Sequence, residues 1–360
     1  MIRIGAVGYG DIAQRQHFPD LKALAGMAEL VAIQGRDSAA LQDCARRFDV
    51  PRWHTDGAAI LDDPAIDAVL VLTPPDSHFN YAQRAIRAGK HVLVEKPLAR
   101  CAAEAAELAD EAQRQQALRP VTCFPLPHVE TAEHELVRRL LAQGVIGEVT
   151  LVECHRGHRG PTHAGWFYDR ARAGGGVLID LGIYQLSAVA ALFGPALRMT
   201  ASCTRYFTER RLDDGSVVVP DVEDSAMLTL ALASGVAVSM NASWNGCQSH
   251  RATRARVTVI GREGMMYFGL PDRAVRVHRP DDMYERLLAG AQAESFDGYA
   301  CRRIATGSAQ ARRSTVGDFV ARIQAGDTST RMLAIQAHVL EIVERAYGSA
   351  AEGIVLTTRF

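Results

Sequence analysis

The first third of the chain alternates short apolar runs with amphipathic stretches. The apolar runs are rich in Val, Ile and Leu, and they read IRIGAV from residue 2, ELVAIQ from 29, DAVLVL from 67, HVLVE from 91 and PVTCF from 120. Helical patterns separate them at 12–24, 38–48, 77–88 and 102–116. Uninterrupted apolar strands joined by helices are typical of a parallel sheet covered on both faces. Residues 1–123 are therefore predicted to form a doubly wound α/β domain.

The pattern changes after about Val129. One amphipathic helix is predicted at 133–143, and after Gly144 come longer strands with few helices between them. The strands read EVTLVECHR, LRMTASCTRYF, DSAMLTLAL, GVAVSMNASW, ARVTVIG and GMMYFG, and turn residues separate them. Two more helices are predicted at 316–324 and 332–347, whereas 280–315 has no clear period. Residues 124–360 are therefore predicted as an α+β domain with a large antiparallel sheet.

Composition narrows the classes of partner. The chain has 40 Lys and Arg against 41 Asp and Glu, so no basic surface for nucleic acid or an anionic membrane is expected. It opens on a strand without a signal-peptide pattern, and no apolar run approaches the ~20 residues that cross a bilayer. A cytoplasmic protein that binds small molecules is expected.

Cysteines and histidines point to neither a disulfide framework nor a metal site. Seven cysteines, at 44, 101, 123, 154, 203, 247 and 301, are scattered and odd in number, which is typical of reduced, buried thiols. His155, His158 and His163 lack a Cys or carboxylate spaced to complete a ligand set. We interpret this segment as a polar loop near a ligand pocket, and no metal is expected.

A glycine-rich turn after the first strand is typical of nucleotide binding. GYGDIA, at 8–13, follows a strand and opens a helix within a βαβ unit. Gly8 permits the tight turn, Gly10 lets the backbone approach a pyrophosphate, and Ala13 lets helix and strand pack closely. The phosphates would lie against N–H groups at the positive end of the helix. The alternative is a purely structural glycine turn.

The end of the second strand bears on which nicotinamide cofactor binds. An acidic residue there would accept hydrogen bonds from the ribose 2′-OH of NAD. Instead, Gly35 removes that carboxylate, and Arg36 offers a forked donor suited to the 2′-phosphate of NADP. NADP(H) is therefore favoured over NAD(H). In the alternative, Arg36 is an exposed loop residue and Asp37 or Ser38 caps the next helix.

A second glycine-rich stretch, GGGVLIDLGIYQLS at 174–187, places Asp180 and Tyr184 one helical turn apart. If a helix begins there, both side chains project from one face. A phenol, with an ordinary pKa of ~10, donates a proton to a nascent alkoxide more readily than it removes one at neutral pH. The pair is a candidate reaction centre that favours carbonyl reduction. The alternative for Tyr184 is a core tyrosine on an apolar helix.

Four motifs together resemble one known family: GYGDIA at 8–13, TPPDSH at 73–78, EKP at 95–97 and GGGVLIDLGIY at 174–184. In their order and spacing the chain is similar to the glucose-fructose oxidoreductase/inositol dehydrogenase (Gfo/Idh/MocA) family over nearly its whole length. The resemblance implies an N-terminal Rossmann domain, a C-terminal open-faced antiparallel sheet, NAD(P) as cofactor, and sugars or cyclitols as substrates. It also implies a homodimer or homotetramer in which another subunit covers the open sheet face.

The resemblance also implies residue roles. Lys96 matches the family's catalytic lysine beside the nicotinamide ring, and the Lys96–Pro97 bond is often cis in the family. A lysine whose pKa is depressed by burial and the cationic ring can move the proton that accompanies hydride transfer, although a surface lysine at a strand end is the alternative. The expected cofactor contacts are Gly8, Tyr9, Gly10, Asp11, Ile12, Gly35, Arg36, Thr73, Pro74, His78, Glu95 and Lys96.

Three departures from the family pattern are informative. Tyr184 stands where many relatives have His, and Ser187 where they usually have Asp. Tyr184 resembles the subgroup of glucose-fructose oxidoreductase, dihydrodiol and xylose dehydrogenases and some nucleotide-sugar ketoreductases, which tends to use NADP(H). CFPLP, at 123–127, lacks the Asn and Arg of many relatives, so a less polar pocket edge is expected.

These assignments predict a reaction. Tyr184 is expected as proton donor or acceptor, Lys96 as its electrostatic partner or the alternative acid/base, and Asp180 as an anchor for substrate hydroxyls. His163 and Trp166 are expected on the substrate side, although Trp166 as a core residue is the alternative. The prediction is an NADP(H)-dependent oxidoreductase that interconverts a secondary alcohol and ketone, or an aldose and lactone, on a sugar, sugar derivative or cyclitol. The alternatives are an NAD-dependent sugar or inositol dehydrogenase, a glycoside hydrolase that retains its nicotinamide cofactor, and a non-catalytic nucleotide sensor.

Overall fold

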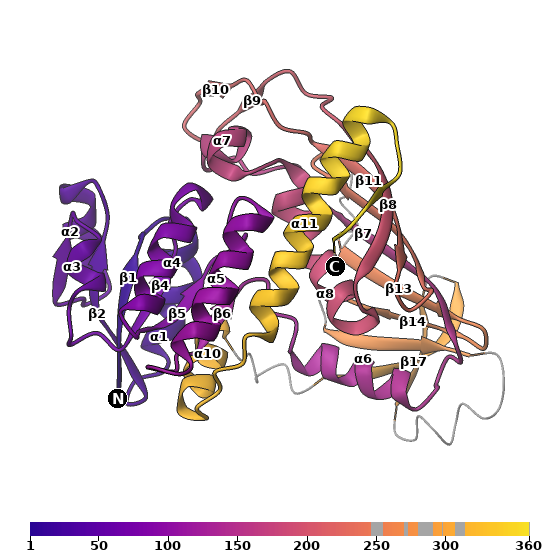
Figure 1. Ribbon diagram of the computed structural model, residues 1–360, viewed down its shortest axis with the longest axis horizontal. Helices are drawn as coiled ribbons and strands as arrows, with labels where there is room; N and C mark the ends of the chain where they lie inside the picture. Colours follow the sequence, from indigo (N-terminus) through magenta and orange to yellow (C-terminus); the bar gives the residue numbers. More distant parts are fainter. Residues whose placement is uncertain (246–254, 270–272, 280–290, 297, 307–313, 360) are drawn as a thin grey trace. The chain divides into compact units, whose positions relative to one another are not determined.

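Two compact units make up the chain in a computed structural model (Figure 1). The structure describes residues 1–245, 255–269, 273–279, 291–296, 298–306 and 314–359, so the cysteine at position 247 lies outside the described residues. The first unit comprises Met1–His128, Ala171–Gly174 and Arg312–Leu340, and the second comprises Val129–Arg170, Gly175–Ala311 and Glu341–Phe360.

The first unit is built on a six-stranded parallel sheet in the order β3-β2-β1-β4-β5-β6. Its strands are β1 (Ile2–Val7), β2 (Ala28–Gln34), β3 (Arg52–His54), β4 (Ala68–Val71), β5 (His91–Val94) and β6 (Cys123–Pro125). The strand order reverses between β1 and β4, where ligands of doubly wound sheets bind. The predicted doubly wound fold is confirmed, and the loops after β1 and β4 carry two of the predicted cofactor motifs.

Helices connect these strands close to the predicted positions. They are η1 (Ala13–His17), α1 (Phe18–Lys22), α2 (Ser38–Arg47), α3 (Ala58–Leu61), η2 (Pro75–Ser77), α4 (His78–Arg87) and α5 (Ala102–Gln115). The helix predicted at 12–24 is divided, since η1 is a π-helical turn and α1 starts anew with Pro19 in its first turn. Proline suits that position because it has no N–H to donate.

One late segment corrects the predicted domain division. Helix α10 (Thr315–Gln324) was assigned with the rest of 124–360 to the second domain, but it packs on α1 and β5 of the first unit. Its Val316, Phe319 and Val320 are buried in the same apolar cluster as Ile4 and Ile33. A helical period reveals an apolar face but not its partner, so the boundary was wrong for this helix.

The second unit is built on a ten-stranded sheet in the order β16-β17-β15-β14-β13-β7-β12-β11-β8-β18. Its strands are β7 (Val149–Gly157), β8 (Ala196–Thr204), β11 (Ser225–Leu232), β12 (Ala237–Ser243), β13 (Ala255–Gly261), β14 (Met265–Phe268), β15 (Ala274–His278), β16 (Gln292–Phe296), β17 (Tyr299–Ala305) and β18 (Leu356–Thr357). Among the described strands, neighbours are antiparallel except the parallel pair β7 and β12. The predicted large antiparallel sheet is confirmed with that one exception.

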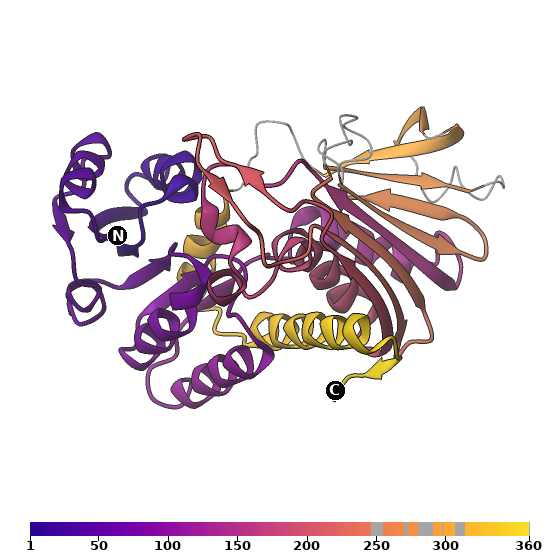
Figure 2. The ribbon, with the colours of Figure 1, turned by 90° about the horizontal axis from the view of Figure 1, so that it is seen from above.

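Helices of the second unit lie along one side of this sheet, and within the described ranges Figure 2 shows no helix covering the other side. They include α6 (Ala132–Ala142), η3 (Gly165–Tyr168), η4 (Leu178–Gly182) and α8 (Ile183–Phe193), while α7 (Arg170–Ala173) and α11 (Arg331–Glu352) cross the division between the units. A short hairpin, β9 (Arg210–Arg211) and β10 (Val217–Val218), pairs separately. Along β11 side chains alternate between buried, such as Leu228, and exposed, such as Met227.

One apolar run is longer than expected from the sequence. Residues Arg170–Phe193 form a helical stretch, bent at 174–176, that is long and apolar enough to cross a membrane by length and composition alone. The expectation that no run approaches this length was therefore wrong. Most of the stretch is buried inside the protein, as in the core helix of a globular domain.

Candidate active site

The glycine turn after β1 leaves room for a ligand. Gly8 has a φ of +92°, and a Cβ there would lie 2.6 Å from the carbonyl carbon of Leu72, so only glycine fits. A Cβ at Gly10 would meet no heavy atom within 4 Å. The backbone at Gly10 therefore faces open space, as the close approach of a pyrophosphate requires.

The remaining predicted contacts around this turn come from two loops. Asp11 and Ile12 follow the turn and are exposed. Thr73 and Pro74 follow β4, which pairs with β1 in the parallel sheet. Since the carboxyl ends of neighbouring parallel strands lie at one edge, both loops border the switch point of the sheet.

Tyr9 covers the glycine that follows β2. A Cβ on Gly35 would overlap the Tyr9 ring, so the aromatic ring lies directly against the glycine backbone. The Asp37 side chain caps α2, where Oδ1 accepts from the backbone N–H groups of residues 39 and 40 at 3.0 and 3.1 Å. The alternative role for Asp37 as a helix cap is thus confirmed. Arg36 is exposed, and no side-chain partner binds it among the described residues.

The EKP motif after β5 is held by a buried histidine. Glu95 Oε1 lies 2.8 Å from His17 Nε2, and Oε2 accepts from the Lys96 backbone N–H at 3.0 Å. Burial alone would raise the pKa of Glu95, but the hydrogen bond and charge of His17 outweigh it and lower that pKa below its ordinary value. The Lys96–Pro97 bond is cis, as the resemblance implied.

His78 joins two loops of the first unit. Its ring is fully buried, and Nδ1 and Nε2 lie 2.7 Å from the carbonyl oxygens of Pro97 and Thr73, respectively. Burial lowers the pKa of this imidazole. The sequence predicted His78 as a cofactor contact, whereas both ring nitrogens face protein carbonyls. His78 therefore fixes the loops that carry the motifs.

Asp180 of the second unit is buried on η4 and held by a tryptophan. Trp244 Nε1 donates to Asp180 Oδ2 at 3.1 Å, and His158 Nε2 lies 3.8 Å from the same oxygen. Indole is a donor only, so this bond keeps the Asp180 carboxyl oxygen as an acceptor. Sequence reasoning missed Trp244, which looks like an ordinary strand residue at the end of GVAVSMNASW.

A second carboxylate explains the glycine triplet before Asp180. Glu223 is buried, and it accepts from the N–H groups of Gly176 at 3.1 Å and Leu178 at 3.0 Å and from the Tyr347 hydroxyl at 2.9 Å. A Cβ on Gly175 would overlap Tyr347, and one on Gly176 would overlap the Glu223 backbone. Burial raises the pKa of both Glu223 and Tyr347. These contacts fix where η4 begins and thereby orient Asp180.

Tyr184 is half-buried on α8 beneath a guanidinium. The Arg156 guanidinium carbon lies 4.0 Å from the centroid of the Tyr184 ring. Gln185 Nε2 donates to the His155 carbonyl at 3.4 Å, which ties α8 to β7 beside this contact. Asp180 and Tyr184 thus both meet residues at the carboxyl end of β7. Side chains of a strand alternate between its two faces, so Arg156 lies on the same face as the buried Val152 and Cys154. A charged residue at a position where burial is expected is a signal that could have identified Arg156 from the sequence.

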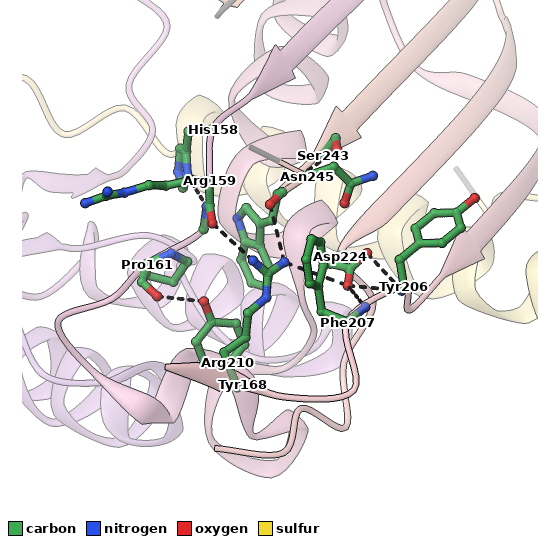
Figure 3. A network of polar contacts seen from close by, with 12 residues as sticks. His158, Arg159, Pro161, Tyr168, Tyr206, Phe207, Arg210, Asp224, Ser243 and Asn245 are labelled. Atoms are coloured by element: carbon green, nitrogen blue, oxygen red, sulfur yellow. Dashed lines mark hydrogen bonds and ion pairs between the residues drawn. The ribbon is translucent and has the colours of Figure 1, made fainter. Parts of the chain in front are cut away.

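A polar network around Arg210 and Asp224 holds the backbone of Trp244 (Figure 3). The Arg210 guanidinium donates to the carbonyls of Arg159 at 3.2 Å and Trp244 at 3.3 Å, and lies 3.7 Å from the Phe207 ring centroid. Asp224 lies 3.8 Å from Arg210, and its carbonyl accepts from Trp244 N at 2.7 Å. The network fixes the backbone from which the indole reaches Asp180.

The predicted substrate residues His163 and Trp166 belong to an aromatic cluster around η3. His163 is exposed with its ring edge-on to Phe167 at 5.3 Å, and Trp166 stacks on Phe167 at 3.7 Å. Among the described residues, no group of three His, Cys, Asp or Glu side chains could hold a metal ion.

The apolar CFPLP segment of the first unit is buried throughout. Its Phe124 and Leu126 belong to the core cluster of that unit, and burial raises the pKa of Cys123 to about 12. The sequence predicted this segment as a less polar pocket edge. Phe124 and Leu126 pack in the core of the first unit, and the less polar pocket edge stays a prediction.

Comparisons with known proteins agree with the motifs. A model described as "Oxidoreductase family, NAD-binding Rossmann fold" matches residues 2–122, and one for the GFO/IDH/MocA C-terminal domain matches 134–267. The dTDP-3,4-didehydro-2,6-dideoxy-alpha-D-glucose 3-reductase of Streptomyces violaceoruber is 31% identical over 337 residues, 89% of this chain and 91% of the relative. An uncharacterized oxidoreductase, sll0816, of Synechocystis is 29% identical over 282 residues, 77% of this chain and 74% of the relative.

Solved structures share the fold. A levoglucosan dehydrogenase in complex with NADH and L-sorbose superposes with a TM-score of 0.84 at 21% identity, over 99% of both chains. The aldose-aldose oxidoreductase from Caulobacter crescentus, complexed with glycerol, gives a TM-score of 0.76 at 22% identity, also over 99% of both chains. At these identities the likeness establishes the architecture of the chain.

Proposed function

Because the chain belongs to the Gfo/Idh/MocA family of oxidoreductases, with an NAD-binding Rossmann fold, we propose that it is an NADP(H)-dependent enzyme acting on a carbohydrate. The reaction interconverts a secondary alcohol and a ketone, or an aldose and a lactone, on a sugar, sugar derivative or cyclitol. The observation that carries the proposal is a half-buried phenol, Tyr184, one turn after a buried and anchored carboxylate, Asp180.

The proposed cofactor site is the edge of the first unit's sheet. The turn at Gly8 to Ile12 would receive the pyrophosphate, and the loops at Thr73 and Lys96 would border the nicotinamide. When bound, the nicotinamide supplies the chemistry of hydride transfer. Asp37 is engaged as a helix cap, so Arg36 is the charged side chain left to meet the adenosine ribose. This supports a 2′-phosphate, and hence NADP(H).

Tyr184 and Lys96 are proposed to transfer the proton that accompanies the hydride. In the direction of reduction, Tyr184 Oη gives its proton to the substrate's carbonyl oxygen, and Lys96 serves as an electrostatic partner or the alternative acid. Asp180, kept as an acceptor by Trp244, receives hydrogen bonds from neighbouring substrate hydroxyls. Such an anchor orients the carbonyl for reaction without changing its own protonation.

The names of relatives support a carbohydrate substrate. The Streptomyces violaceoruber relative is named as a reductase of a dTDP-linked dideoxy sugar, and the structural neighbours are named for levoglucosan and for aldoses. We therefore propose a ketosugar or aldose as substrate. Two alternative functions must be distinguished from this proposal: an NAD-dependent dehydrogenase and a glycoside hydrolase that retains its cofactor.

The test is a screen of the purified protein with NADPH, NADP, NADH and NAD against ketosugars, aldoses, inositols and glycosides. Turnover of a ketosugar or aldose with NADP(H) supports the proposal. Turnover with NAD(H) alone overturns the cofactor assignment. Glycoside cleavage without net change in cofactor absorbance identifies the hydrolase, and no turnover with any sugar removes the proposed substrate class.

We also propose a cytoplasmic homodimer or homotetramer joined through the open face of the second unit's sheet. Met227, 60% exposed on β11, and the neighbouring Thr229 lie on that face. The support for this assembly is the open sheet face itself, which a second subunit could cover. Light scattering coupled to gel filtration tests the assembly, and a monomer at micromolar concentration would overturn it.

A further inference from the structure

Arg156 lies over the face of the proposed catalytic phenol. Its guanidinium carbon is 4.0 Å from the Tyr184 ring centroid, well within the ~6 Å over which a cation interacts with an aromatic face. Both side chains are half-buried, which weakens screening by water. No carboxylate forms an ion pair with Arg156 among the described residues. Its positive charge beside the Tyr184 ring is therefore not neutralised by an ion pair there.

The surrounding backbone fixes this contact. Arg156 is the penultimate residue of β7, an interior strand, where it pairs with Ala242 of β12 and Ala255 of β13. On the other side, Gln185 ties α8 to the His155 carbonyl. Sheet pairing thus fixes the backbone that carries Arg156, and the Gln185 contact fixes the turn of α8 next to Tyr184. In this arrangement the guanidinium already lies over the Tyr184 ring.

We propose that Arg156 is a positioning residue that acts through Tyr184 by favouring its phenolate form. The inference rests on the proposed function. In reduction the substrate's carbonyl carbon receives a hydride, with its electron pair, which the reduced nicotinamide of the proposed function would supply, and the O–H bond of Tyr184 breaks. The substrate oxygen takes that proton and becomes a hydroxyl, and the phenolate later regains a proton from water.

The charge of Arg156 matters most while this proton moves. A guanidinium stays protonated at all working pH values, so it cannot compete for the proton itself. Its attraction to the ring strengthens as negative charge develops on the phenol, and its position is set in advance by β7. An interaction that is stronger in the transition state than in the ground state raises kcat rather than lowering KM.

The first test removes the charge and keeps the apolar stem. Arg156→Met is expected to lower kcat roughly tenfold with KM changed less than about twofold. Arg156→Lys, which retains a cation near the ring, is expected to recover most of the loss. Arg156→Gln provides a second neutral variant should the methionine variant not fold. As a matched control, Arg256→Met removes a guanidinium 5.8 Å from the Tyr267 ring and is expected to leave kcat unchanged.

A double-mutant cycle separates the mechanism from a structural role. Tyr184→Phe keeps the ring and the cation contact but has no proton to give. In that background Arg156→Met is expected to change kcat less than about twofold, because Arg156 acts through the hydroxyl. The same loss in both backgrounds, a rise in KM at unchanged kcat, or no recovery with lysine would overturn the inference.

The turnover of Tyr184→Phe tests the proposed function separately from the role of Arg156. Parent-like turnover in Tyr184→Phe would remove Tyr184 from proton transfer, whatever Arg156→Met does in the parent. A slow Tyr184→Phe enzyme with additive Arg156→Met losses would keep the proposed function and overturn the role of Arg156 alone.

Discussion

Replacing Trp244 by Phe should weaken the second unit and the proposed site together. Trp244 is 1% exposed, and its indole N–H donates to Asp180 at 3.1 Å. A hydrogen bond to a charged group contributes about 1.5–3 kcal/mol. The smaller ring also leaves a cavity in a packed interior. We expect Trp244→Phe to lower the free energy of unfolding of this unit by about 2–4 kcal/mol.

The same substitution should loosen the substrate anchor. Without the indole, the Asp180 Oδ2 atom loses its 3.1 Å hydrogen bond while His158 Nε2 stays 3.8 Å away, and the carboxylate is held less firmly. If Asp180 receives substrate hydroxyls, a loss of roughly 1.4 kcal/mol of anchoring lowers kcat/KM about tenfold. The measurements are thermal unfolding and steady-state kinetics with the substrate found by the cofactor screen.

Tyr168→Phe is the matched control for this prediction. It also removes one buried donor, since the Tyr168 hydroxyl donates to the Pro161 carbonyl at 2.6 Å, and its ring packs edge-on to Trp244 at 5.5 Å. A bond between neutral groups contributes about 0.5–1.5 kcal/mol, so the loss of stability should be smaller and kcat/KM unchanged. Equal stability losses in both variants, or unchanged kcat/KM in Trp244→Phe, would refute the reasoning.

Three further predictions concern single residues. Gly176→Ala should prevent stable folding of the second unit, whereas Gly10→Ala should preserve the melting temperature and weaken cofactor binding, measured by calorimetric titration; equal melting temperatures would contradict this. Arg36→Ala should raise KM for NADPH roughly tenfold and leave that for NADH within about twofold; an unchanged NADPH value removes the 2′-phosphate assignment. The lowered pKa of Glu95 means that its pairing with His17 stabilises the first unit fully above the ordinary pKa of ~4.3, and that this stability is lost as pH falls through the lowered pKa. In Glu95→Gln the free energy of unfolding should therefore decrease less as the pH falls than it does in the parent protein. The same decrease in both proteins would contradict the pairing.

Local patterns were sufficient to predict most elements of the fold. The uninterrupted apolar runs of β1, β2, β4 and β5 fit a sheet buried on both faces, and the alternating burial of β11 fits a sheet with one open face. The assignment of α10 failed because its apolar face could pack on either unit. Such a choice depends on contacts between distant segments, which periodicity does not encode.

The candidate site shows the same division between local and distant information. Asp180 and Tyr184 could be predicted because one short motif contains both. Trp244, which holds Asp180, is 64 residues away in sequence, and Glu223 lies 47 residues from the Gly176 N–H that it accepts. Neither stands in a recognisable motif, so sequence reasoning found the side chains proposed to react and missed those that hold them.

The two glycine-rich segments, at 8–13 and 174–187, look alike in sequence, but their glycines are required for different reasons. At Gly10 an added Cβ would meet nothing, so the missing side chain leaves space for something outside the chain. At Gly175 and Gly176 an added Cβ would overlap Tyr347 or Glu223, so the missing side chains are needed for internal packing. The first glycine is required by a ligand and the second pair by the fold. The glycine triplet therefore acts on the proposed chemistry indirectly, by bringing the backbone of η4 against Glu223 so that Asp180 and Tyr184 leave the helix in fixed directions.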